Sequence, residues 1–268
     1  MDIVHFLGYF SALFIGLVLG LIGGGGSILT VPIFVYILGI NPVIATAYSL
    51  FVVGCSSAVG AYDNFKKGRI NLKSSLVFAI PAVFSIFCTR KFIVPAIPQH
   101  LFNIGLFEVT KEILIMVLFA ILMILASFSM IFKKKLPKTS SSSSPKYGLT
   151  VLFGIITGIV TGFVGAGGGF MIVPILIFLV GLEMKEAVGT SLFIIALNSI
   201  IGFTGDLSHL EIAWSFLLSF TAISIIGIFL GIYLNKFLKP EGLKKIFGWL
   251  VLVMGIYIIW RELSISVF

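Results

Sequence analysis

Long apolar segments alternate with short polar ones along the whole chain. Continuous apolar runs occupy residues 4–22, 42–62, 72–94, 112–132, 147–164, 187–204, 212–234 and 246–260. A helix needs about 20 mainly apolar residues to cross a hydrocarbon core of ~30 Å, whereas outer-membrane strands show shorter segments of alternating polarity. The pattern therefore predicts an all-α polytopic membrane protein.

Composition supports the same class. Of the 268 residues, 59% are hydrophobic and 10% are charged, and the mean hydropathy is +1.20. A soluble domain carries about 25% charged residues. Asp2 and His5 stand where a cleavable signal would have basic residues, so the first run is expected to be a mature span. We expect a multi-pass protein of the cell inner membrane.

The sequence repeats itself at an offset of 142 residues without a gap. Val31-Pro32-Ile33 falls on Val173-Pro174-Ile175, and Ser49-Leu50-Phe51 falls on Ser191-Leu192-Phe193. Five glycines also coincide: Gly16, Gly20, Gly23, Gly25 and Gly26 fall on Gly158, Gly162, Gly165, Gly167 and Gly168. This register predicts two homologous transmembrane repeats, 1–132 and 147–268, joined by a cytoplasmic basic and Ser-rich linker at 133–146.

The basic residues distinguish two topologies. If each glycine segment folds back as a hairpin and the N-terminus lies outside, the inner loops at 66–73, 133–146, 182–186 and 235–245 hold 14 of the 18 Lys and Arg. Arg90, Lys91, Lys111 and Arg261 are then outside. Eight simple spans that begin inside would leave 10 basic residues inside. The positive-inside rule favours the hairpins, and that topology inverts the second repeat relative to the first.

The duplicated glycine runs are the main candidates for a binding site. An 11-residue segment such as 28–38 rises only about 16 Å as a helix, so it cannot span alone. Irregular backbone within a membrane survives where it is buried or lines a polar cavity, and inverted repeats with broken helices are typical of secondary transporters. Glycine lets a ligand approach the backbone, and unpaired N–H groups at a helix start favour an anion. The candidates are Gly23, Gly24, Gly25, Gly26, Ser27, Gly165, Gly167, Gly168 and Gly169.

Close helix packing is the alternative explanation of glycine in a membrane. We favour packing for Gly16, Gly20 and the G-x-x-x-G series from Gly154 to Gly162, and broken joints for the two glycine runs. Ser49, Ser191 and Asn198 are further candidates for the site, although polar groups in a span often bond only a neighbouring carbonyl. Asn64 and Asp206 occupy equivalent span ends, where a capping or loop role is expected.

Other functional classes lack their signatures. No Lys-Ser/Thr follows Gly26, so the run is not a P-loop, and no third glycine completes a dinucleotide motif. Cys55 and Cys88 have no spacing that indicates a metal or disulfide, and the basic residues lie in loops rather than on a nucleic-acid-binding face. We therefore expect no cofactor, no metal, no nucleic acid and no enzymatic activity.

The sequence resembles the sulfite exporter TauE/SafE family. The resemblance rests on "GLIGGGGSILTVPIF" (20–34) and "GFVGAGGGFMIVPIL" (162–176), and on "ATAYSLF" (45–51) and "AVGTSLF" (187–193). It covers essentially the whole chain, and it implies an inner-membrane carrier without an ATPase that moves small sulfur-containing or organic anions, usually outward. Members of this family are often described with about eight spans.

We therefore predict a secondary transporter, and more narrowly an exporter, of a small anion of the sulfite, sulfonate or small carboxylate type. The lipid bilayer is the expected environment, and a homodimer is conceivable. A polytopic membrane enzyme and a membrane assembly subunit remain the alternatives. The enzyme would require a nucleophile, acid–base pair or metal set facing a cavity, and the subunit would leave the repeated broken elements unexplained.

Overall fold

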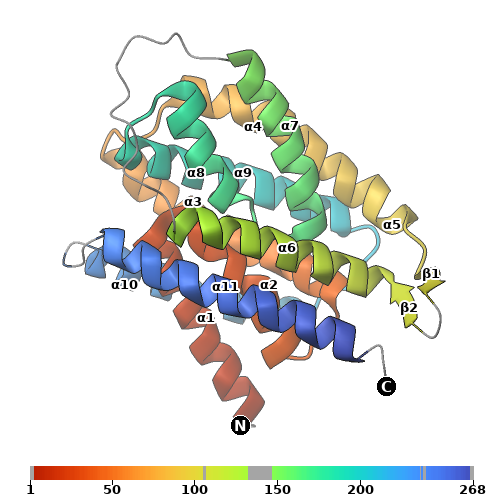
Figure 1. The fold of residues 1–268 in the computed structure, drawn as a ribbon. Helices are drawn as coiled ribbons and strands as arrows, with labels where there is room; N and C mark the ends of the chain where they lie inside the picture. Colours follow the sequence, from red (N-terminus) through yellow and green to blue (C-terminus); the bar gives the residue numbers. More distant parts are fainter. Residues whose placement is uncertain (1–2, 105–106, 132–146, 236, 238–239, 266–268) are drawn as a thin grey trace.

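A computed structural model describes residues 3–104, 107–131, 147–235, 237 and 240–265 (Figure 1). Within these residues, eight helical segments are long and apolar enough to cross a membrane, as the sequence predicted. The long helices are α1 (Ile3–Ile22), α3 (Pro42–Lys66), α4 (Leu72–Cys88), α6 (Lys111–Ile131), α7 (Tyr147–Val164), α9 (Met184–Asp206), α10 (Trp214–Leu234) and α11 (Pro240–Ile265). The predicted linker at 133–146 lies outside the described residues.

Short elements fill the connections. The first repeat continues from α1 through the 3₁₀ helix η1 (Gly23–Leu29), α2 (Thr30–Pro32) and the π-helix η2 (Ile33–Ile37). The second repeat has α8 (Gly169–Ile175) and η4 (Leu176–Val180) at the equivalent place. α4 continues through η3 (Thr89–Ile93) and α5 (Val94–Ala96) into a hairpin of β1 (His100–Ile104) and β2 (Phe107–Thr110). The sequence pattern did not predict these strands.

Local sequence explains where several helices begin. The Asn41 side chain accepts a hydrogen bond from the Val43 N–H, and Pro42 occupies the first turn of α3. Asn71 caps α4 in the same way by accepting from the Ser74 N–H. Asn is a preferred N-cap residue, and proline suits the first turn because the N–H it lacks would have no partner there.

Both glycine runs reverse the chain, as the hairpin prediction required. Although residues 3–37 are helical throughout, a Cβ at Gly8 would lie 2.9 Å from Leu38 Cδ2, so η2 returns to the level at which α1 began. A Cβ at Gly168 would lie 2.6 Å from Thr161 Oγ1, and η4 packs beside α7. Each run is therefore a turn between a long helix and a short helical segment packed against it. We call residues 23–27 the first joint and residues 165–169 the second joint.

Equivalent helices of the two repeats pack against each other in opposite directions. On α3 and α9, the backbone of Gly54 lies against Ile200, whereas that of Gly189 lies against Asn64. The order along one helix is reversed on the other, so the two helices are antiparallel. The same holds for α6 and α11, where Gly248 lies against Ile131 and Gly255 against Ile124.

Non-equivalent helices form the other close pairs, and these run parallel. A Cβ at Gly16 of α1 would lie 1.9 Å from the Ser224 carbonyl oxygen of α10, and Gly20 lies against Ile228 one turn further on. α7 and α4 form the matching pair, with Gly154 against Phe78 and Gly162 against Thr89. The expected packing role of these glycines is confirmed, because any side chain would separate the helices.

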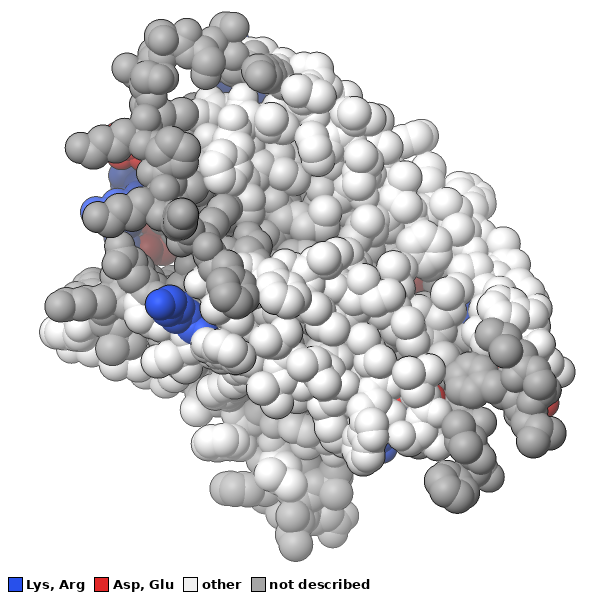
Figure 2. Space-filling view, in the orientation of Figure 1, with Lys and Arg blue, Asp and Glu red and all other residues white. Residues whose placement is uncertain are grey.

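The outer surface of the bundle is apolar. Large hydrophobic side chains such as Phe84, Ile226, Phe229 and Trp249 are exposed on the long helices. In Figure 2 the visible face is almost entirely uncharged between two ends at which Lys, Arg, Asp and Glu appear. A surface of this kind suits a hydrocarbon environment, with charged residues at the two interfaces.

Candidate functional site: two joints and a cationic cavity

The two joints meet in the middle of the protein. A Cβ built on Gly169 would lie 2.1 Å from the Gly24 carbonyl oxygen, so the two backbones are in direct contact. The Ser27 hydroxyl is hydrogen-bonded to the carbonyl oxygen of Ala166, and it is also 2.8 Å from the Gly24 carbonyl oxygen. The joints of the two repeats are thus in direct contact at the place where the sequence predicted a site.

The joints share one conformational feature. Gly23 and Gly165 occupy the same repeat position and have φ angles of +74° and +72°. This left-handed conformation suits glycine because a Cβ there would crowd the following carbonyl oxygen. Beyond that residue the joints differ, since the first continues as a 3₁₀ helix while the second has two more residues of positive φ, Gly167 and Gly168.

A cavity of about 670 Å³ opens beside the joints. Gly23 and Gly25 of the first joint and Gly169 of the second line it, so it reaches the predicted glycine site. Its remaining walls come from α1, α3, α8, α9, α10 and the end of α6. A space of this size accommodates a small organic or inorganic anion with its water.

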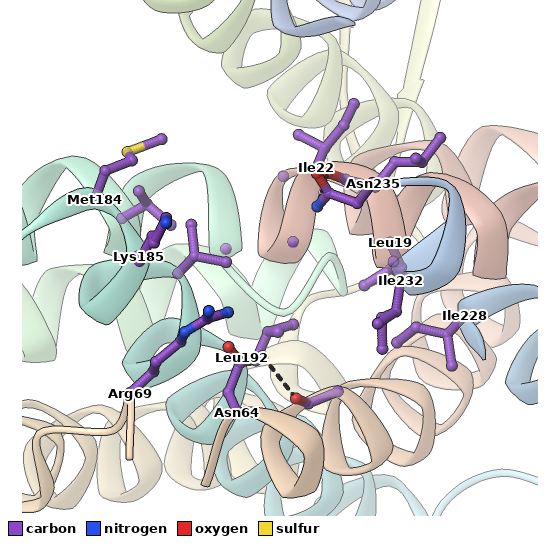
Figure 3. A pocket seen from close by; sticks show the side chains of 18 of the residues that line it. Leu19, Ile22, Asn64, Arg69, Met184, Lys185, Leu192, Ile228, Ile232 and Asn235 are labelled. Atoms are coloured by element: carbon purple, nitrogen blue, oxygen red, sulfur yellow. Dashed lines mark hydrogen bonds between the residues drawn. The ribbon is translucent and has the colours of Figure 1, made fainter. Parts of the chain in front are cut away.

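The mouth of this cavity is rich in basic side chains. Arg69 and Lys185 lie on one side and Asn235 on the other (Figure 3). Lys67 also lines the cavity but forms an ion pair with Asp63. Clefts that carry charge of one sign concentrate ions of the opposite sign, so this mouth attracts anions.

Several buried polar atoms of α3 and α9 have no hydrogen-bond partner among the described residues. They include the hydroxyls of Ser49, Ser57 and Ser199, and both side-chain polar atoms of Asn198. A Cβ at Gly167 would lie 3.0 Å from Ser199 Oγ, which places that hydroxyl at the second joint. Buried polar groups are normally bonded, so unsatisfied ones require an explanation such as a ligand or water.

The structure buries all the residues that the sequence selected for the site. Gly23–Gly26, Ser27, Gly165 and Gly167–Gly169 form the joints, and Ser49, Ser191 and Asn198 are fully buried in α3 and α9. Their environments differ. Ser191 Oγ donates to the Val188 carbonyl oxygen of its own helix at 2.9 Å, whereas Ser49 and Asn198 keep unused hydrogen-bonding capacity.

Arg90 and Asp206 depart from the sequence-based expectation. The hairpin topology counted Arg90 among the basic residues of the outer side and gave it no partner, and the structure buries its side chain fully. Its Nη1 donates to Thr46 Oγ1 at 3.1 Å and lies 3.4 Å from Asp206 Oδ2. The expectation that the Asp206 side chain only caps a helix or serves a loop was therefore wrong. The available signal was the position of Arg90 inside the apolar run 72–94, because a charge within a span often has a function.

The described residues contain no cluster of His, Cys, Asp and Glu that could hold a metal ion. Cys55 and Cys88 are free thiols.

Eight candidate spans, two glycine joints in contact and an internal cavity with a basic mouth define a class, that of polytopic helical membrane proteins with a solute-sized cavity. Comparison with known proteins narrows this class to one family. The model of the sulfite exporter TauE/SafE family matches residues 9–258, and the chain belongs to that family.

Curated relatives agree with this assignment. A "probable membrane transporter protein" of Xylella fastidiosa (strain Temecula1) is 30% identical over 92% of both chains. YjnA of Bacillus subtilis, with the same description, is 28% identical over 92% of this chain and 96% of its own. MJ0441 of Methanocaldococcus jannaschii is 28% identical over 91% and 93%. No solved structure gives a significant match. The protein is thus a multi-pass inner-membrane protein and a membrane transporter.

Proposed function

We propose that the protein is a secondary transporter that exports a small anion, and that the anion binds where the two glycine joints meet. The observation that carries this proposal is the 670 Å³ cavity, which connects a basic mouth to Gly23, Gly25 and Gly169. Sulfite, sulfonates, other organosulfur anions and small carboxylates are the proposed substrate classes, of which the description of the family names sulfite.

Electrostatics favours an anion at each stage of entry. Arg69 and Lys185 raise the local anion concentration at the mouth. Deeper in, glycine backbone without side chains allows close approach, and the unpaired hydroxyls and amide around the joints can donate hydrogen bonds. Anions that lose water in the cavity can thus regain hydrogen bonds from the protein.

The two repeats are proposed to be inverted in the membrane. Two observations support this: equivalent helices α3 and α9 run antiparallel, and so do α6 and α11. The four long helices of a repeat would by themselves return the chain to the side of the membrane on which it began. The hairpin at each joint adds one more reversal, so the second repeat begins on the opposite side of the membrane from the first. With the N-terminus outside, the cavity mouth at Lys67 and Lys185 faces the cytoplasm, in accord with the positive-inside rule.

Outward movement of an anion would need no ATP. An inside-negative potential drives negative charge outward by about 2.3 kcal/mol per charge per 100 mV. An inverted repeat with broken helices at its centre is the architecture in which such carriers alternate their access. We therefore expect uniport driven by the membrane potential.

The test is flux of sulfite, thiosulfate, a sulfonate and a carboxylate in proteoliposomes under a potassium–valinomycin potential at equal pH. Flux should follow the sign of the potential and should fall several-fold in Arg69→Gln and in Lys185→Gln. Lys91→Gln is the matched control, because Lys91 is an exposed basic residue that does not line this cavity. Absence of flux for every anion would contradict the proposal, and flux that follows only a pH gradient would contradict uniport.

A further inference from the structure

The end of the bundle opposite the cavity is closed by a buried polar contact. It consists of Thr46 near the start of α3, Arg90 in η3 and Asp206 at the end of α9, and we call these three the closed-end residues. The cavity lies toward the other end of α3, where Gly60 and Asn64 line it. All three closed-end residues are at most 4% exposed.

The internal repeat gives each closed-end residue a counterpart. The offset of 142 residues pairs Thr46 with Val188, Arg90 with Ile232 and Asp206 with Asn64. All three counterparts line the open cavity, and we call them the open-end residues. Equivalent positions of the two repeats therefore form an ion pair at one end of the bundle and line an open cavity at the other end.

The position of the contact along the protein also fits a barrier. On its far side from the joints lies a depression of about 300 Å³, lined among others by Asp206, Lys111 and His209. On its near side, a Cβ at Gly165 would lie 2.4 Å from the Thr46 carbonyl oxygen, so Thr46 touches the second joint. The Arg90–Asp206 pair thus separates this depression from the joints.

The pair has the properties of a contact that can open. Arg90 Nε and Nη2 have no hydrogen-bond partner within the described part of the chain, and the 3.4 Å separation from Asp206 is longer than a strong charge-assisted bond. A buried ion pair gains little net stability because desolvation offsets the attraction. Separation would expose a positive Arg90 to an entering or leaving anion.

We propose that the Arg90–Asp206 ion pair, held by Thr46, is the gate that closes this transporter at the end opposite the cavity. The structure is then the state open at the Asn64 end and closed at the Asp206 end. This inference rests on the proposed transport function, but it is tested without any substrate. Transport requires this gate to open as the Asn64 end closes.

The experiment replaces the gate with the residues that the repeat places at the open end. In full-length protein with Cys55→Ala and Cys88→Ala, Ser49→Cys serves as reporter, because Ser49 is buried one helical turn beyond Thr46. The labelling rate with a charged maleimide is measured on purified protein in detergent. We expect Arg90→Ile with Asp206→Asn to raise the Ser49→Cys rate at least tenfold.

A second reporter separates a gate from a merely structural pair. Ser127→Cys is a buried reporter in α6, a helix that contributes none of the closed-end residues, and its rate should change less than twofold. An equal rise at both reporters would indicate general loosening and would overturn the gate. A Ser49→Cys rate within twofold of the parent, in a variant that elutes as folded protein, would also overturn it.

The reciprocal variant tests the idea even if the double replacement fails to fold. Asn64→Asp with Ile232→Arg installs the pair at the open end, and the reporter is Ser191→Cys, the counterpart of Ser49. We expect its labelling to fall at least fivefold, since the new pair would close the cavity mouth. Unchanged labelling of Ser191→Cys would contradict the gate. Loss of flux in these variants would not by itself decide the question, whereas the labelling rates do.

Discussion

The first and second joints occupy the same place in the repeat, yet they leave different room around their backbones. Gly25 and Gly167 are equivalent positions. Among the described residues, a Cβ on Gly25 would meet only Ile22 Cγ2, at 3.4 Å, and the φ of Gly25 is not positive. A Cβ on Gly167 would meet three side chains within 3.0 Å, and its φ is +67°.

This difference separates two reasons for a glycine. At Gly167 the fold itself excludes a side chain, through backbone conformation and through packing. At Gly25 the fold tolerates a methyl group, and this residue lines the cavity. Because the fold would accept a side chain at Gly25, packing does not explain the glycine there. Its place beside the cavity indicates a ligand that approaches the backbone. Four substitutions at or between the joints test this contrast.

The largest effect is expected for Gly169→Ala. Its new methyl would lie 2.1 Å from the Gly24 carbonyl oxygen, a backbone atom that can move only if the joints separate. Overpacking costs 1–3 kcal/mol and occasionally more, so we expect a loss of about 3 kcal/mol and no transport. Thermal unfolding in detergent measures the loss of stability, and flux in proteoliposomes measures the loss of transport. Gly148→Ala is the control, because no atom of the described residues lies within 4 Å of a Cβ at this position, and it should not lower stability.

Gly167→Ala should cost about 2 kcal/mol, since a left-handed non-glycine residue alone costs 1–2 kcal/mol and the methyl also crowds Ile195, Ser199 and Val53. Gly181→Ala isolates the cost of the left-handed backbone, because Gly181 has a φ of +80° and an added Cβ would have no described atom within 4 Å. A melting temperature of Gly167→Ala equal to that of Gly181→Ala would show that packing at the second joint is unimportant.

Ser27→Ala should cost about 1 kcal/mol, the net value of one hydrogen bond. The lost bond joins the two joints through the Ala166 carbonyl oxygen. Ser11→Ala is the matched control, since the Ser11 hydroxyl donates to the Leu7 carbonyl oxygen of its own helix. Equal unfolding temperatures for the two variants would mean that the bond between the joints adds nothing to stability.

Gly25→Ala should change stability least, by no more than about 0.5 kcal/mol and in the stabilising direction, because alanine restricts the unfolded chain. Flux should nevertheless fall about tenfold if the anion approaches this backbone. Normal flux in Gly25→Ala would remove the first joint from the site. Loss of both flux and stability would mean that the structural contrast with Gly167 is wrong.

Much of the fold followed from the sequence. Apolar runs of sufficient length predicted the spans, and the offset of 142 residues predicted two equivalent sets of helices. Gly23 and Gly165 were expected at breaks, and both adopt positive φ. These features depend on local composition and backbone sterics, which are properties of a segment rather than of its neighbours. The β-hairpin of β1 and β2 was not predicted, because strands of five and four residues are too short to show a clear period.

The side-chain partners were decided only in three dimensions. The Ser27 hydroxyl meets a carbonyl oxygen 139 residues away, and Arg90 meets Asp206 from the other half of the chain. The sequence showed a charge within an apolar run but not what neutralises it. Likewise, Gly25 and Gly167 are the same letter at the same repeat position, and their different surroundings come from helices of both repeats. The sequence by itself determined the spans, the duplication and the place of the joints, because the length of an apolar run and its glycine content are properties of a local segment. Tertiary structure alone decided which end is open and which glycine has room, because these depend on how helices distant in sequence pack together.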